Sequence, residues 1–253
     1  GARAKEPSLG PRGELAFTVH GRGVTELGLL EADAGPCHGG KTPSNDGPCS
    51  TARYLYRSQG RVEAAEPAWS PDGERLAFSR WQPGGQRDIV ILDRATGALH
   101  AVTDDRAQDI NPAWTPDGAH LLFVSDRSGI SNVYAYSLAT DRVVQVTNVI
   151  AGAFQPTPSP DGAQLAFVGF TSAGYDLFLM EMPPLDTLPE ARPDRGGRPP
   201  AQTITPEAFP AREYSPLPTL WPLTWLPVAG TDARGMTLGV TTAGDDVVGL
   251  YSY

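Results

Sequence analysis

This sequence has little of what marks membrane-spanning, helical or nucleic-acid-binding proteins. None of its apolar runs reaches the eighteen residues of a spanning helix, and no segment of useful length has the 3.6-residue periodicity of an amphipathic helix. Acidic residues outnumber basic ones by 29 to 20, which gives a formal net charge of −9. This balance disfavours nucleic acid and anionic membrane surfaces as the main partner.

Signatures of catalysis and metal binding are missing too. A serine hydrolase holds its nucleophile in a G-x-S-x-G turn before a helix, and the sequence has no such motif. The four histidines, His20, His38, His100 and His120, stand in separate segments and are interpreted as surface or strand-edge residues. No catalytic residue, cofactor or metal site is therefore predicted.

Glycine and proline are abundant, with 28 and 25 residues. Together with a hydrophobic content of 40%, they favour a turn-rich all-β fold over disorder. One phrase recurs at intervals of 45 and 44 residues: PAWSPDGERLAF from Pro67, PAWTPDGAHLLF from Pro112 and PTPSPDGAQLAF from Pro156. Repeats of about 40–45 residues with several short strands are typical of β-propeller blades.

Each repeat is interpreted as four antiparallel strands, A to D. In the second repeat the strands are predicted at Pro67–Trp69, Arg75–Arg80, Asp88–Asp93 and Ala98–Thr103. Ser-Pro-Asp-Gly suits the A–B hairpin, because proline presets φ, aspartate bonds its own backbone and glycine accepts positive φ. Asp72, Asp117 and Asp161 are accordingly interpreted as turn residues rather than metal ligands.

A weaker copy of the phrase, EPSLGPRGELAF, occupies Glu6–Phe17, so four repeats are visible. The predicted fold class is all-β, a propeller of four-stranded antiparallel blades. Four blades are the lower limit of known propellers, and closure of the ring stays open. The fourth repeat is expected to take strand D from AQTIT, residues 201–205.

Two insertions are expected between strands C and D, one in the first repeat and one, Pro183–Pro200, in the fourth. The first contains both cysteines, Cys37 and Cys49. A disulfide between them would restrict a Gly/Pro-rich loop by about 3 kcal/mol and would indicate an oxidising, extracytoplasmic compartment. Two unpaired thiols are the alternative, and a zinc site with His38 would lack a fourth ligand.

The repeats resemble the WD-like repeats of the TolB family, whose phrase combines a proline, a tryptophan, Ser-Pro-Asp-Gly and a Leu-Ala-Phe strand. The resemblance covers Glu6 to Thr205 and is strongest in the second and third repeats. It implies a propeller. Such repeats occur in periplasmic TolB, in prolyl-oligopeptidase-like peptidases and before outer-membrane barrels, so the resemblance does not choose a function.

The end of the chain departs from the repeat. Domains are predicted at residues 1–211, the propeller repeats, and 212–253, a Pro-rich linker with terminal strands. Gly235–Tyr253 alternates Met236, Leu238 and Val240 with small or polar residues and resembles the opening strands of outer-membrane proteins that carry a TolB-like propeller before a barrel. Alternatively, these strands form a last blade and close the ring.

Four aromatic residues, Trp81, Phe154, Phe170 and Tyr175, fall in predicted connections on the face opposite the insertions. They form the candidate binding surface, because exposed aromatic residues commonly anchor protein partners. The alternative is that they only cover blade ends.

The function predicted from these features is a noncatalytic, extracytoplasmic propeller that binds or scaffolds protein or peptide partners in the bacterial cell envelope. It would lie in the periplasm or at the outer membrane, the latter through a C-terminal barrel. Two alternatives stay open. One is the propeller domain of a prolyl-oligopeptidase-like peptidase. The other is a carbohydrate-active propeller, which would need clustered carboxylates or metal ligands in its central channel.

Overall fold

The computed structural model describes residues 3–21, 23–31, 52–58, 60–194, 215, 217, 222, 225–232 and 235–244. The chain divides into two compact units, Gly1–Ala201 and Gln202–Tyr253. None of the helices in the described part is long and apolar enough to cross a membrane. Cys37, Cys49 and the expected strand at 201–205 lie outside the described residues.

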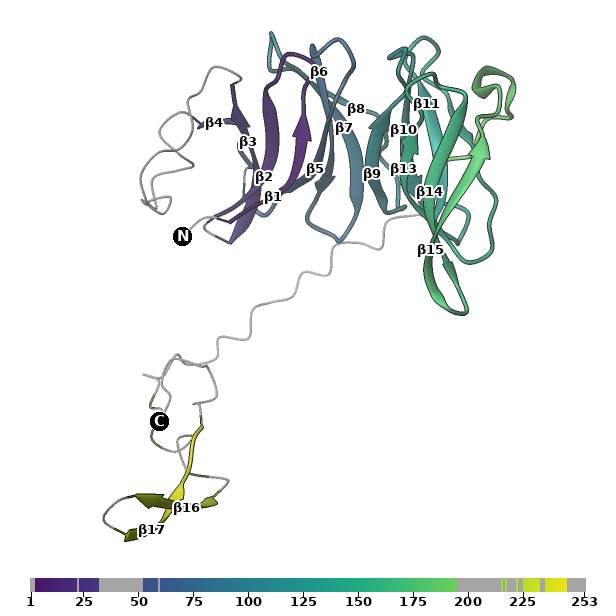
Figure 1. Cartoon of the computed structure of the whole chain (residues 1–253). Helices are drawn as coiled ribbons and strands as arrows, with labels where there is room; N and C mark the ends of the chain where they lie inside the picture. The colour runs from purple at the N-terminus through teal and green to yellow at the C-terminus, as the bar shows by residue number, and fades with distance from the viewer. Residues whose placement is uncertain are drawn as a thin grey trace. The chain divides into compact units, whose positions relative to one another are not determined.

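The first unit is a row of antiparallel sheets (Figure 1). The first sheet contains β1 (Arg3–Leu9), β2 (Leu15–Gly21), β3 (Val24–Leu30) and β4 (Ala52–Tyr56). The second contains β5 (Glu63–Trp69), β6 (Arg75–Trp81), β7 (Arg87–Asp93) and β8 (Leu99–Ala101). The third contains β9 (Asp109–Trp114), β10 (His120–Ser125), β11 (Asn132–Ser137) and β12 (Val143–Gln145). The fourth contains β13 (Ala153–Pro158), β14 (Gln164–Thr171) and β15 (Gly174–Glu181).

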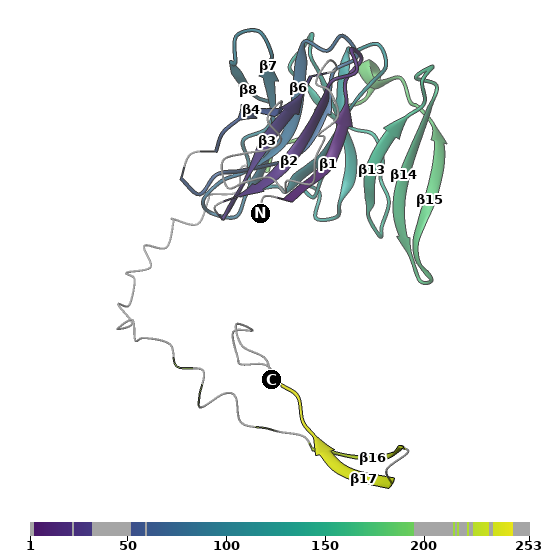
Figure 2. The same ribbon diagram turned by 60° about the vertical axis from the view of Figure 1, so that its left-hand side comes forward.

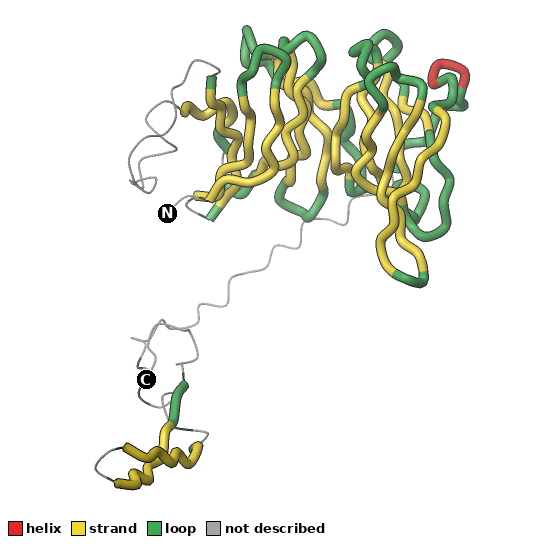
Figure 3. Tube along the Cα trace, in the orientation of Figure 1, coloured by secondary structure: helices red, strands yellow, loops and turns green. Residues whose placement is uncertain are grey.

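Strands within each sheet are paired in sequence order, as in propeller blades, which confirms the predicted fold class. The inner strands β1, β5, β9 and β13 pack side by side along the row. Figure 2 shows β13–β15 as the last sheet on its side of the molecule. Figure 3 shows that the unit is built of strands and loops, with a single helical turn at Leu185–Thr187 among its described residues.

The Ser-Pro-Asp-Gly phrases form the predicted hairpins. Asp72 Oδ1 accepts hydrogen bonds from Ser70 Oγ at 2.5 Å and from the Glu74 backbone N–H at 2.9 Å, and Gly73 has φ +71°. The hydrogen bond from Ser70 is the main cause that lowers the pKa of Asp72. Thr115–Asp117 and Ser159–Asp161 repeat these contacts. The aspartates are therefore turn residues.

Three apolar cores lie between neighbouring sheets, one for each adjacent pair. We call the side of a sheet that faces the next repeat its forward face. In the first three sheets this face contributes buried residues from the second and third strands: Ala16, Leu27 and Leu29; Ala77, Ile89 and Ile91; Leu122, Val133 and Ala135. Because side chains alternate along a strand, the other side of the second, third and fourth sheets packs on the preceding repeat.

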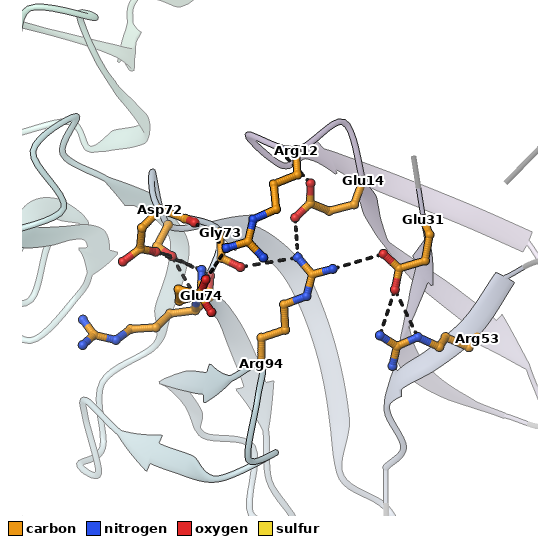
Figure 4. A network of polar contacts seen from close by, with 10 residues as sticks. Arg12, Glu14, Glu31, Arg53, Asp72, Gly73, Glu74 and Arg94 are labelled. Carbon is orange, nitrogen blue, oxygen red and sulfur yellow. Dashed lines mark hydrogen bonds and ion pairs between the residues drawn. The ribbon is translucent and has the colours of Figure 1, made fainter. Parts of the chain in front are cut away.

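A network of charged side chains joins the first two sheets (Figure 4). Arg94 contacts Glu14 at 2.5 Å and Glu31 at 3.1 Å, and Glu31 also contacts Arg53 at 2.9 Å. Burial opposes ionisation of Glu14, but hydrogen bonds from its own backbone and from Arg94 outweigh burial and lower its pKa. Arg12, which replaces the turn aspartate in the first repeat, pairs with Glu74. These contacts link the weakest copy of the repeat to the second sheet.

The second unit contains one described hairpin, β16 (Leu226–Asp232) and β17 (Gly235–Thr241). The register pairs Met236, Leu238 and Val240 with Thr231, Ala229 and Pro227, respectively. The predicted apolar row therefore lies on one face of a hairpin, and its three side chains are exposed.

Candidate protein-binding surface

The four aromatic residues of the candidate surface lie in strands, not in the connections where the sequence placed them. Trp81 ends β6, Phe154 belongs to β13, Phe170 to β14 and Tyr175 to β15. The prediction of their location was wrong because β6, β14 and β15 extend beyond the repeated apolar phrase. Backbone pairing, rather than apolar content, sets the length of these strands.

Phe170 and Tyr175 form an aromatic pair at one end of the fourth sheet. They are directly opposite each other in the β14–β15 register, with ring centroids 5.2 Å apart and the rings at 70°. This edge-to-face arrangement is favourable for aromatic rings. Tyr175 is 72% exposed and Phe170 is also exposed. The pair therefore presents apolar surface to the solvent.

A cavity of about 350 Å³ connects this pair to the inner strands. Phe154, Val168 and Tyr175 supply its apolar wall, and Asn111 and Gln155 supply its amides. The Phe154 ring lies close to the backbone of Gly152, where a Cβ would be only 2.8 Å from the ring. Apolar walls with a few polar groups are typical of binding pockets.

The cavity and the aromatic pair belong to the forward face of the fourth sheet. In the register, Phe154 pairs with Val168, which pairs with Leu177, and these residues share one face with Phe170 and Tyr175. Leu177 and Leu179 are 78% and 64% exposed. They stand 44 residues after Val133 and Ala135, which are fully buried against the fourth sheet. The fourth sheet thus exposes a surface that its predecessors bury.

Trp81 is separate from this surface. It lies under the guanidinium of Arg87, whose central carbon is 5.0 Å from the ring centroid, and it lines a second cavity of about 400 Å³ beside Gly23 and Val24 of the first sheet. Three of the four predicted aromatic residues are therefore brought together, and the fourth stands alone.

A chain of hydrogen bonds that the sequence interpretation missed joins the four inner strands. The Glu66 N–H donates to Glu6 Oε2 at 3.0 Å, the Asn111 N–H to Glu66 Oε2 at 2.8 Å and the Gln155 N–H to Asn111 Oδ1 at 3.3 Å. We call this series the inner-strand ladder. Each of the four residues has φ between 50° and 57° and lies at a β-bulge.

The sequence did hold a signal for the ladder, because an acidic or amide residue precedes the first proline of every repeat. A residue before proline normally adopts extended backbone. Left-handed backbone costs about 1–3 kcal/mol in such residues and needs compensation from its surroundings. Here the bulge frees the N–H from the sheet, and the side chain of the preceding repeat accepts it. Burial raises the pKa of Glu66 within this ladder.

A second charged cluster is internal to the third sheet and its border with the second. Arg127 lies 3.2 Å from Asp109 and 3.6 Å from Asp105, and all three side chains are buried. Burial raises the pKa of Asp109 to about 6, although Arg127 acts in the opposite direction. Arg127 also lies over the rings of Phe123 and Tyr134. The three charged side chains therefore contact one another inside the protein.

Within the described ranges, no group of three or more histidine, cysteine, aspartate or glutamate side chains is placed to hold a metal ion. The predicted disulfide between Cys37 and Cys49 lies outside the described residues.

Comparisons with known proteins agree on the architecture. The model of the TolB beta propeller domain matches residues 51–187. A protein assigned as TolB from Agrobacterium tumefaciens is 21% identical, with a TM-score of 0.58 over 71% of this chain and 62% of its own. TolB from Acinetobacter baumannii is 20% identical, with a TM-score of 0.59 over 95% of this chain and 52% of its own. A puromycin-hydrolyzing peptidase of Mycobacterium tuberculosis is 19% identical, with a TM-score of 0.55 over 76% of this chain and 31% of its own.

At these identities the solved structures show a shared fold alone. The chain spans between about half and three fifths of the length of the two TolB structures. No curated protein sequence matches it.

Proposed function

Because the chain belongs to the TolB β-propeller domain family, we propose that it is a noncatalytic propeller that binds or scaffolds proteins in the bacterial cell envelope. The observation that carries this proposal is the exposed forward face of the fourth sheet. Phe170, Tyr175, Leu177 and Leu179 expose apolar side chains there, and Phe154 lines the adjoining cavity. Contiguous apolar surface of this kind marks interaction sites.

The partner is a protein or peptide rather than nucleic acid. The surface is apolar and aromatic, and the whole chain carries a net charge of −9, which opposes phosphate binding. Aromatic side chains supply large contact areas at low cost in conformational entropy. The side-chain amide of Gln155, which lines the cavity, can add hydrogen bonds to a peptide backbone.

Photocrosslinking in cells tests the proposal. Tyr175 is replaced by a photoreactive phenylalanine analogue in the exported chain, and adducts are identified by mass spectrometry. Trp81, an exposed residue of β6 in the second sheet, receives the same replacement as the matched control. We expect a discrete envelope-protein adduct from position 175 alone. Absence of adducts, or equal adducts from both positions, would overturn the proposal.

The extracytoplasmic location belongs to the same proposal and depends on the cysteines. Mass spectrometry of peptides from the exported protein should find Cys37 and Cys49 joined by a disulfide, since oxidising compartments favour such bonds. Two free thiols in exported protein would contradict this part. The peptidase alternative is supported by a likeness in fold at 19% identity, which covers 31% of the peptidase chain.

A further inference from the structure

The outer strand of the second sheet, β8, has an open hydrogen-bonding edge. Ala98 and Val102, at the two ends of β8, make backbone hydrogen bonds to β7. Alternate residues of an antiparallel strand bond to opposite sides, so His100 also bonds to β7, whereas Leu99 and Ala101 point their N–H and C=O groups outward. These outward groups have no hydrogen bond in the described part of the chain. Such an edge can accept a further strand.

The equivalent edge of the third sheet already carries an added segment. Val143 of β12 stands 44 residues after Leu99, and its C=O accepts the Ala191 N–H at 2.7 Å. The neighbouring residues Val144 and Glu190 form an antiparallel bridge. A segment that follows β15 therefore covers the edge of β12, whereas no described segment covers the same edge of β8.

Two cavities lie between the second and third sheets along the open edge. Residues 98–100 line one of about 310 Å³, and residues 101–103 line the other, of about 470 Å³. Asp141 lines both cavities. His100 is opposite Ile91 in the register and so belongs to the forward face of the second sheet. A strand added to β8 would therefore direct alternate side chains into the space between the sheets.

The two cavities are acidic. Asp141 is exposed, and its Oδ1 accepts a hydrogen bond from the Tyr136 hydroxyl at 2.5 Å. His100 Nε2 lies 2.9 Å from the same hydroxyl oxygen. The second carboxylate oxygen of Asp141 has no hydrogen bond or ion pair to any described residue. The charged residues that line the cavities are five acids and two arginines: Asp93, Asp104, Asp105, Asp141 and Glu190, with Arg75 and Arg127. Basic side chains complement such a surface.

We propose that the open edge of β8 binds an extended basic segment of a partner protein, which adds an antiparallel strand to the second sheet. Residues of the segment opposite Leu99 and Ala101 exchange backbone hydrogen bonds with them. The residue opposite His100 directs a lysine or arginine side chain toward Asp141. In this mode of recognition, main-chain hydrogen bonds give affinity and pockets for alternate side chains give specificity. The site uses no residue of the fourth sheet and is independent of the proposed function.

A capped synthetic peptide, Thr-Lys-Val-Lys-Val-Lys-Thr, is the probe. Its central lysine is placed opposite His100, and its two valines are placed opposite Leu99 and Ala101. Fluorescence anisotropy of the labelled peptide with the purified full chain should show saturable binding. The same peptide with both valines N-methylated keeps its charge but loses the N–H groups that pair with β8. It should bind at least about tenfold more weakly, as should a peptide with glutamate in place of lysine.

Substitutions in the protein give a second comparison. Ala101→Pro removes an outward N–H at an edge position that tolerates proline, and should weaken binding by at least about fivefold. Asp141→Asn should weaken binding by up to about fivefold, as expected for an exposed ion pair. Asp161→Asn removes a carboxylate from the turn of the fourth repeat and should leave the affinity unchanged. Circular dichroism confirms that each variant is folded, and the comparison of peptides needs only the parent chain.

Hydrogen exchange followed by NMR locates the contact. Addition of the probe should protect the amides of Leu99 and Ala101 and should change that of His100 little, because His100 already bonds to β7. Absence of saturable binding would overturn the inference, as would binding that is indifferent to valine N-methylation or to Ala101→Pro. Probe binding without Tyr175 adducts would leave this site standing and overturn the proposed function. Tyr175 adducts without probe binding would do the reverse.

Discussion

The third and fourth sheets follow the same repeat, but their forward faces differ in burial. Val133 and Ala135 on β11 are fully buried, whereas Leu177 and Leu179, 44 residues later on β15, are mostly exposed. The fourth sheet has the larger apolar side chains of the two. The repeat therefore sets which residues point forward, and the presence of a neighbouring sheet decides whether they form a core or an exposed apolar surface.

The largest expected effect comes from the same substitution at the two equivalent positions. Val133→Asp buries an unpaired charge and should lower the free energy of unfolding by about 4 kcal/mol. Leu177→Asp should change it by no more than about 0.5 kcal/mol, as is usual for exposed sites. Urea unfolding of both variants measures the difference. Equal losses would show that the fourth sheet is covered.

The second prediction uses a buried carboxyl that the third sheet has and the fourth lacks, since Ala153 stands 44 residues after Asp109. The pKa of Asp109 is raised to about 6 in the folded protein, against about 3.9 in an unfolded chain. Between these values the folded state binds more protons, so this group makes stability fall as pH rises from 4 to 6.

Asp109→Asn removes that titration while Asp105 still faces Arg127. The stability of the variant relative to the parent should therefore rise by up to about 3 kcal/mol between pH 4 and pH 7. Denaturant unfolding at the two pH values checks this expectation. Asp117→Asn is the control, because the pKa of Asp117 is lowered mainly by its hydrogen bond from Thr115. Parallel stability curves for Asp109→Asn and the parent would refute the prediction.

The inner-strand ladder gives a third, smaller contrast. Glu66→Ala leaves the N–H of Asn111 without its acceptor and should cost about 1–3 kcal/mol. Gln155→Ala removes a side chain that accepts no backbone N–H among the described residues and should cost less than about 0.5 kcal/mol. Both residues already have positive φ, so backbone strain is the same in the two variants. Similar losses in thermal or urea unfolding would contradict the ladder's contribution.

Substitution of the turn aspartates should lower stability by almost the same amount in the third and fourth repeats. Asp117→Ala and Asp161→Ala each remove the same two hydrogen bonds within a hairpin and should each cost about 1 kcal/mol. Because those bonds are local, the neighbouring sheet should not matter. A loss at Asp117 that exceeds the loss at Asp161 by more than about 1 kcal/mol in urea unfolding would mean that these turns support contacts between sheets.

The sequence predicted the repeat, the hairpins and the strand pattern well, because these depend on local chemistry. The strand expected at Arg75–Arg80 is β6, Arg75–Trp81, and the aspartate of Ser-Pro-Asp-Gly caps its turn as expected. The exposure of Leu177 could not be predicted, since the sequence of an apolar strand is the same whether or not a neighbouring sheet covers it. The ladder was missed because its partners are 44 to 60 residues apart.

Hydrogen exchange of β11 and β15 in the same sample is the most direct test of the exposed fourth sheet as a binding surface. In dilute protein, amides of Gly174–Glu181 should exchange faster than those of Asn132–Ser137, because less packing protects them. Their exchange should slow when the partner protein identified by photocrosslinking is added. Equal protection of both strands in dilute protein, or no slowing on binding, would contradict the assignment of this face.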